Sequence, residues 1–113
     1  MHAEGREAQV RVRDAGGWPE VGRLGERATL VQFSSAFCQP CRATRRVLAE
    51  VAAMVPGVRH VEIDAEAELD LVRELRIAKT PTVLVLDAEG QIVLRAAGQP
   101  RKADVIAALG KAV

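Results

Sequence analysis

The apolar and polar positions of the chain follow two spacings, one typical of strands and one typical of helices. "ATLVQF" at 28–33 is mostly apolar and rich in β-branched residues, which predicts a strand covered on both faces. From Cys41 to Val55 apolar residues recur every three or four positions opposite several arginines, which predicts an amphipathic helix that Pro56 and Gly57 end. "VRHVEID" at 58–64 then predicts another strand.

The second half of the chain continues this alternation. "AELDLVRELRI" predicts a short helix from the spacing of Leu69, Leu71, Val72 and Leu75. Residues 83–86 form an unbroken apolar run, and the turn sequence "DAEG" joins it to a hairpin arm at 91–96. Residues 100–113 predict a last helix whose apolar face is formed by four residues: Val105, Ile106, Leu109 and Val113.

The first part of the chain carries weaker patterns. "AQVRVR" at 8–13 alternates apolar and polar residues, which predicts a half-exposed strand. Glycine and proline then limit residues 18–24 to at most a short helix. The length fits a single domain over residues 1–113, with about the first seven residues as a loose segment.

The resulting order is strand, short helix, strand, helix, strand, helix, two strands and a helix. Helices between the early strands predict parallel pairing, and the hairpin adds antiparallel strands. We therefore expect an α/β fold with a central mixed sheet of five strands and helices on both faces. The chemistry of such folds lies at the carboxyl ends of the strands, which is where both cysteines fall.

Charge and hydropathy exclude several classes of function. The net charge is +1 and the charged residues are scattered, so nothing favours nucleic acid as a partner. No apolar run is long enough to span a bilayer, and "MHAEGREAQVRVR" lacks the apolar core of a secretory signal. We expect a cytoplasmic location, although the sequence leaves open a leader or anchor removed before its first residue.

Cys38 and Cys41 are the two cysteines of the chain, separated by Gln39 and Pro40. Cys38 falls at the start of the predicted helix, where free backbone N–H groups and the helix dipole stabilise a thiolate and lower its pKa. Cys41 lies one turn further on, at a spacing that permits a disulfide. Pro40 suits a first turn, which has no use for its missing N–H. The pair can therefore act as a nucleophilic and a resolving thiol.

Two other interpretations of the pair stay open. A structural zinc site needs four ligands, and the only other soft candidates are His2 and His60 at distant positions. A structural staple between residues three apart closes a very small loop and adds little stability. Redox chemistry is favoured over both, and no metal is expected.

Several motifs together identify the chain as similar to the thioredoxin family from about residue 8 onward. They are the C-x-P-C at 38–41 after a strand ending in Phe33, "VEID" at 61–64, "TPT" at 80–82 before an apolar strand, and Gly98 before the last helix. The resemblance implies the three-layer thioredoxin-like fold. It also implies a cis peptide bond between Thr80 and Pro81 facing the cysteines, with the Thr80 backbone pairing with a substrate chain.

The function that follows is thiol-disulfide exchange on protein or small-molecule disulfides, more as a reductant than an oxidant. The substrate would dock on a rim of five residues: Phe37, Gln39, Pro40, Thr80 and Pro81. No organic cofactor is needed besides the Cys38–Cys41 pair, a separate reductase resets it, and we expect a monomer serving electron transport and cell redox homeostasis. The alternatives are a non-catalytic module that grips an extended partner chain and, within the enzyme class, an oxidant or isomerase.

The chain departs from the thioredoxin pattern near the cysteines. Phe37 and Gln39 stand where tryptophan and glycine are usual, and Arg46 replaces a proline of the helix. Gln32 replaces a buried aspartate, and His60 matches its usual lysine partner.

Because glutamine cannot titrate, we hypothesise that His60 partly takes over proton transfer for Cys41. Gln32 is expected to be a buried amide bonded to Cys41 or His60. The arginines at 42, 45 and 46 are expected to form a solvated helix face or, alternatively, a positive field near Cys38.

Overall fold

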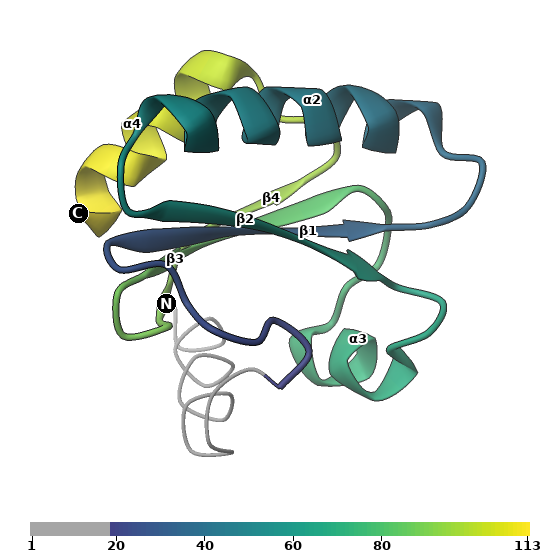
Figure 1. The fold of residues 1–113 in the computed structure, drawn as a ribbon. Coiled ribbons are helices and arrows are strands. Elements are labelled where there is room, and N and C mark those ends of the chain that lie inside the picture. Colours follow the sequence, from purple (N-terminus) through teal and green to yellow (C-terminus); the bar gives the residue numbers. More distant parts are fainter. Residues whose placement is uncertain (1–18) are drawn as a thin grey trace, which may run out of the picture.

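The computed structural model describes residues 19–113. Its centre is a four-stranded sheet in the order β2-β1-β3-β4 (Figure 1). The strands are β1 (Ala28–Ser34), β2 (Val58–Asp64), β3 (Thr82–Asp87) and β4 (Ile92–Ala97). β1 pairs in parallel with β2 and antiparallel with β3, and β3 and β4 form the antiparallel hairpin. The predicted mixed sheet is therefore confirmed.

Three helices cover the sheet. α2 (Gln39–Met54) and α4 (Lys102–Ala112) lie on one face, and α3 (Leu69–Leu75) lies on the other (Figure 1). This arrangement confirms the predicted layers. The predicted strand at 8–13 and the loose segment at 1–7 lie outside the described residues, so the count of four strands refers to residues 19–113.

Residues 19–24 form turns and bends and no helix, which corrects the described part of the short helix expected at 18–24. Gly22 supplies a positive φ of 77° there, a conformation that favours glycine and interrupts a helix. The last helix also begins later than expected, because Pro100 and the N-cap residue Arg101 both precede it.

The sheet separates two apolar cores, one on each face. Val31 and Phe33 of β1 pack with Leu71 and Leu75 on the α3 side. Leu30 belongs to the core on the other side, among residues of α2, β3 and α4. The alternation along β1 thus buries every residue of the strand, as its apolar sequence predicted. A strand fixed on both faces holds the loop that follows it, which contains Cys38.

Three apolar residues whose spacing predicted the last two helices are exposed. Leu69 on α3 is 52% exposed, and Ile106 and Val113 are 44% and 51% exposed. On α4 the buried stripe is Val105, Ala108 and Leu109, so the helix turns a small alanine toward the sheet where the periodicity suggested Ile106. Ala108 lies three positions after Val105 and Leu109 lies four positions after it, and both spacings place residues on the same face of a helix.

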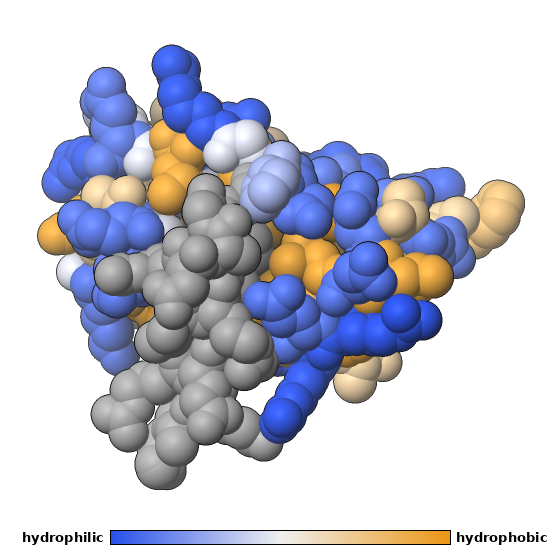
Figure 2. All heavy atoms as spheres, turned by 90° about the horizontal axis from the view of Figure 1, so that it is seen from below, coloured by the Kyte–Doolittle hydropathy of each residue, from blue (hydrophilic) through white to orange (hydrophobic). Residues whose placement is uncertain are grey.

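The outer surface is predominantly polar on the side that carries α3. Figure 2 shows hydrophilic residues around a smaller group of apolar ones on that side. Among the helices of residues 19–113, none combines the length and the apolar character that a bilayer crossing requires.

Candidate active site

The candidate site lies where the buried strand β1 gives way to α2. β1 ends at Ser34, and the N-cap of α2 is Cys38 in an extended conformation. Between them Phe37 adopts a positive φ of 59°, which is uncommon for a bulky residue, and its side chain is 99% exposed. Pro40 lies in the first turn of the helix, where its missing N–H costs nothing.

Cys38 and Cys41 are joined by a disulfide, with their Cα atoms 5.2 Å apart. Cys38 is half-buried at the helix terminus, whereas Cys41 is only 1% exposed. The backbone N–H of Cys41 donates a hydrogen bond to Sγ of Cys38 over 3.2 Å. One sulfur is therefore accessible and receives a backbone donor, and the other is enclosed one turn away. The predicted positions of both cysteines are confirmed.

The loop before β3 faces this disulfide. The Thr80–Pro81 peptide bond is cis, as the resemblance implied. The carbonyl oxygen of Thr80 lies 4.0 Å from Sγ of Cys38, and its hydroxyl is hydrogen bonded to that of Ser35 over 2.7 Å. Ser35 was not predicted as a site residue, yet it ties the Thr80 loop to the cysteine loop.

The five expected rim residues differ in how much surface they offer. Phe37, Gln39 and Pro40 are exposed beside Cys38, and Thr80 is half-buried. Pro81 is buried, so it supports the rim from beneath and offers little surface itself. The N–H of Gly98 donates to the Pro81 carbonyl over 2.8 Å, which fixes this loop to the end of β4.

Gln32 lies fully buried beneath the cysteines. Its amide nitrogen donates to the backbone carbonyl of Cys41 over 2.8 Å and to the Ser34 hydroxyl over 2.9 Å. Its amide oxygen lies 3.3 Å from Nε2 of His60. The expectation of a bonded core amide is confirmed, and Gln32 bonds with Cys41 and His60 together.

These contacts define the tautomer of His60. A backbone carbonyl can only accept a hydrogen bond, so the Gln32 amide nitrogen must face the Cys41 carbonyl and the Gln32 amide oxygen must face His60. The imidazole of His60 therefore donates from Nε2. Burial lowers the pKa of His60, and the Glu62 carboxylate only partly opposes this effect. The ring is thus largely neutral at pH 7, and it connects to Cys41 through the Gln32 amide.

An ion pair adjoins this network on the surface. Arg45 of α2 donates two hydrogen bonds of 2.7 Å to the carboxylate of Glu62 on β2. The hydrogen bond from Arg45 lowers the pKa of Glu62 and raises the pKa of Arg45. No sequence pattern indicates this pair, because only the parallel register of β1 and β2 brings Glu62 level with Gln32 beneath α2.

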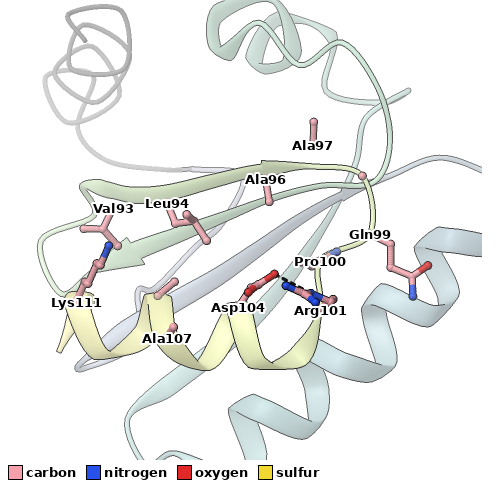
Figure 3. A pocket seen from close by; sticks show the side chains of 12 residues that line it. Val93, Leu94, Ala96, Ala97, Gln99, Pro100, Arg101, Asp104, Ala107 and Lys111 are labelled. Carbon is pink, nitrogen blue, oxygen red and sulfur yellow. Dashed lines mark hydrogen bonds and ion pairs between the residues drawn. The ribbon is translucent and has the colours of Figure 1, made fainter. Parts of the chain in front are cut away.

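Two hollows lie near these elements. The smaller, of about 360 Å³, adjoins the cysteine loop and is lined by Ser34, Ser35, Ala36, Arg45, Glu62 and Asp64. The larger, of about 510 Å³, lies between β4 and α4 (Figure 3), and its lining includes Gly98, whose N–H donates to the Pro81 carbonyl. Its walls are mainly apolar, and two of its three charged residues, Arg101 and Asp104, bond to each other, while Lys111 is the third. Neither hollow contains a cysteine.

The zinc interpretation finds no further support. Across residues 19–113 there is no group of three or more histidine, cysteine, aspartate or glutamate side chains placed to hold a metal ion. His60 already directs Nε2 to Gln32.

The comparisons with known proteins agree with this geometry. The family model for thioredoxin matches residues 19–111. Thioredoxin of Mycobacterium tuberculosis is 28% identical over 109 residues, covering 96% of this chain and 92% of that protein. Thioredoxin-2 of Pyricularia oryzae is 32% identical over 56 residues, covering 50% of this chain and 33% of that protein. The crystal structure of chloroplastic thioredoxin z is 27% identical, with a TM-score of 0.67 and coverage of 91% and 86%.

The chain belongs to the thioredoxin family. The matched part spans less than two thirds of several curated relatives, such as 59% of the H-type thioredoxin of Fagopyrum esculentum. The thioredoxin-like fold with its C-x-x-C pair, expected from the sequence, is confirmed.

Proposed function

We propose that this protein is a thiol-disulfide oxidoreductase that reduces protein disulfides. The observation that carries the proposal is the placement of the two sulfurs. Sγ of Cys38 caps the first turn of α2 and accepts the Cys41 N–H, while Cys41 is enclosed and already bonded to it. A backbone donor and the positive end of a helix favour a thiolate on Cys38 in the reduced protein.

The reaction has two exchange steps. The Cys38 thiolate attacks one sulfur of the substrate disulfide, whose S–S bond breaks, and the departing substrate sulfur takes a proton. Deprotonated Cys41 then attacks Sγ of Cys38, breaks the mixed disulfide and releases the second substrate thiol. Two electrons pass to the substrate, and the Cys38–Cys41 disulfide remains. The 5.2 Å between the Cα atoms supports the second step, because it needs no backbone rearrangement.

The substrate chain lies on the rim around Cys38. The exposed side chains of Phe37, Gln39 and Pro40 offer it apolar and polar contacts, and the Thr80 backbone offers strand-like hydrogen bonds. Pro81 shapes the loop that presents Thr80.

His60 serves the second step as the group that accepts the Cys41 proton. The contacts from His60 to Gln32 and from Gln32 to the Cys41 carbonyl support this role. These contacts end at the backbone carbonyl of Cys41 and do not reach its sulfur. The proton therefore passes from the Cys41 thiol to His60 through a water molecule or after the imidazole ring has rotated.

A separate reductase resets the disulfide, and neither metal nor organic cofactor takes part. The protein acts as a monomer in the cytoplasm, where glutathione and thioredoxin systems keep thiols reduced and electron transport sustains cell redox homeostasis. If the dithiol form is unusually stable, the protein acts instead as an oxidant or isomerase. Equilibrating the cysteine pair with glutathione buffers measures that stability: a potential below about −230 mV supports the reductant and one near −120 mV the oxidant.

The second candidate is a non-catalytic module that grips an extended chain along Thr80 while the cysteines stay idle. The buried amide of Gln32, which has no titratable proton, favours it. Insulin reduction driven by dithiothreitol separates the two candidates. The oxidoreductase requires turnover by the wild type and only background turnover by Cys38→Ser. Equal rates for both proteins, with binding to an extended peptide retained, would establish the module.

A further inference from the structure

Three cationic side chains close to Cys38 have no ion pair or side-chain hydrogen bond within residues 19–113. They are Arg42 and Arg46 on α2 and Lys79 in the loop before β3, and all three are exposed. Arg45 of α2 bonds Glu62, and Lys102 on α4 lies 3.4 Å from Glu50. Arg42, Arg46 and Lys79 therefore leave a positive charge beside the candidate site that no neighbouring carboxylate of the described residues neutralises.

The two arginines follow Cys38 at intervals of four residues along α2. The Arg42 N–H donates to the Cys38 carbonyl over 3.3 Å, which places Arg42 one helical turn beyond the cysteine. Arg46 follows four residues later, and residues at such intervals share one helix face. At 1.5 Å per residue the two arginines lie about 6 and 12 Å along the helix from Cys38.

Lys79 adds a cation from a second element. It directly precedes Thr80, whose carbonyl oxygen is 4.0 Å from Sγ of Cys38. The first turn of α2 contains no acidic residue, and the first acid of that helix is Glu50, already paired. The carboxylates of Glu62 and Asp64 line the smaller hollow beside the cysteine loop, and Glu62 is already paired with Arg45. The cations near Cys38 that have no partner in the described part of the chain thus lie along α2 and at the Thr80 loop.

We propose that the preferred substrate is a protein disulfide with aspartate or glutamate two to four residues from the attacked cysteine. The inference rests on the proposed function. An extended chain advances about 3.3 Å per residue, so two to four residues reach the 6 to 12 Å that separate Cys38 from Arg42 and Arg46. Exposed ion pairs add little affinity, but a cationic strip raises the rate of encounter with an anionic partner at low salt.

The test uses two synthetic peptides of equal length, each closed by one disulfide. One carries aspartate at the second, third and fourth positions after its cysteine, and the other carries lysine there. The dithiothreitol-reduced protein, freed of excess reductant, is mixed with each peptide, and the rate constant of thiol release is followed. We expect about tenfold faster reduction of the aspartate peptide at 0.01 M salt and a difference within about twofold at 0.5 M.

Charge-reversal variants locate the effect. Arg42→Glu, Arg46→Glu and Lys79→Glu each lower the net charge by two, as does the control Lys111→Glu at the far end of α4. The preference for the aspartate peptide is expected to fall at least about threefold in each of these three variants and to stay unchanged in the control. Because the preference is a ratio of two rates in one protein, a general loss of activity does not imitate this result.

Several outcomes would overturn the inference. Equal rates for the two peptides at low salt would do so, and so would a loss in Lys111→Glu as large as in Arg42→Glu, which would assign the effect to net charge. Faster reduction of glutathione disulfide than of the aspartate peptide would replace the protein substrate by a small anionic disulfide. If insulin and both peptides remain oxidised, the proposed function itself fails, and this result differs from an absent preference.

Discussion

The hollow between β4 and α4 and the surface around Cys38 adjoin each other at Gly98, yet they are opposite in character. The hollow is an open depression of about 510 Å³ with mainly apolar walls, and two of its charged residues, Arg101 and Asp104, bond to each other. The surface around Cys38 is shallow and exposed, but a sulfur, a helix terminus and the Thr80 carbonyl converge there. Reactivity in this fold follows the placement of polar groups, and the volume of a cavity does not reveal it.

The largest expected effect tests the division of work between the two sulfurs. Cys41→Ser retains the exposed nucleophile but removes the group that breaks the mixed disulfide. We expect a covalent protein–substrate adduct and multiple-turnover insulin reduction slower by at least about 100-fold. Mass spectrometry detects the adduct. Full turnover by this variant would show that the enclosed sulfur is dispensable.

The next effect concerns the buried network under the site. Gln32→Leu keeps the volume of the side chain but leaves the Ser34 hydroxyl and His60 without their partner. We expect a loss of about 1–3 kcal/mol in the free energy of unfolding, measured by urea denaturation of the oxidised protein. The same replacement at exposed Gln39 is the matched control and should stay within about 0.5 kcal/mol. Equal losses for the replacements at Gln32 and Gln39 would show that the buried network does not stabilise the fold.

A smaller effect is the response of stability to pH. The pKa of His60 is lowered on folding from its ordinary value of 6.5, so the unfolded chain binds a proton more readily than the folded one. Stability should therefore decrease as the pH falls below about 6.5. In His60→Asn the urea midpoint should change less between pH 7.5 and pH 5.5 than it does in the wild type, whatever the stability of the variant at pH 7.5. An unchanged slope in this variant would assign the response to other groups.

The smallest expected effect belongs to the hollow. Ala107→Leu adds apolar volume to its α4 wall (Figure 3) without touching the sulfurs. Because Ala107 is exposed, we expect insulin reduction to change by less than about twofold. A tenfold loss in a variant with normal stability would make the hollow part of the substrate site and would contradict the comparison above.

The sequence correctly predicted the elements in which the spacing of apolar residues matches the pattern of burial in the structure. β1 and α2 appear nearly at the expected residues, because an apolar β-branched run and a three-four spacing leave few alternatives. Cys38 at the helix terminus followed from these two elements. The resemblance to thioredoxins supplied the cis bond at Pro81, which no local pattern distinguishes from a trans bond.

What the sequence missed depends on contacts between distant segments. The Arg45–Glu62 pair needs the register of β1 and β2, and the exposure of Ile106 needs the rotation of α4 on the sheet. The Ser35–Thr80 hydrogen bond joins residues 45 positions apart, and nothing in the sequence of either segment indicates the other. Side-chain periodicity assigns a face to a residue but not a partner.

The first turn of α2 takes its cap from the reacting atom, because the Cys41 amide donates to Sγ of Cys38. A thiolate is a stronger acceptor than a bridged sulfur, so reduction tightens this turn and oxidation relaxes it. The rate at which the Cys41 amide proton exchanges with solvent therefore reports whether the cysteine pair is reduced or oxidised, and the sulfurs themselves need no label.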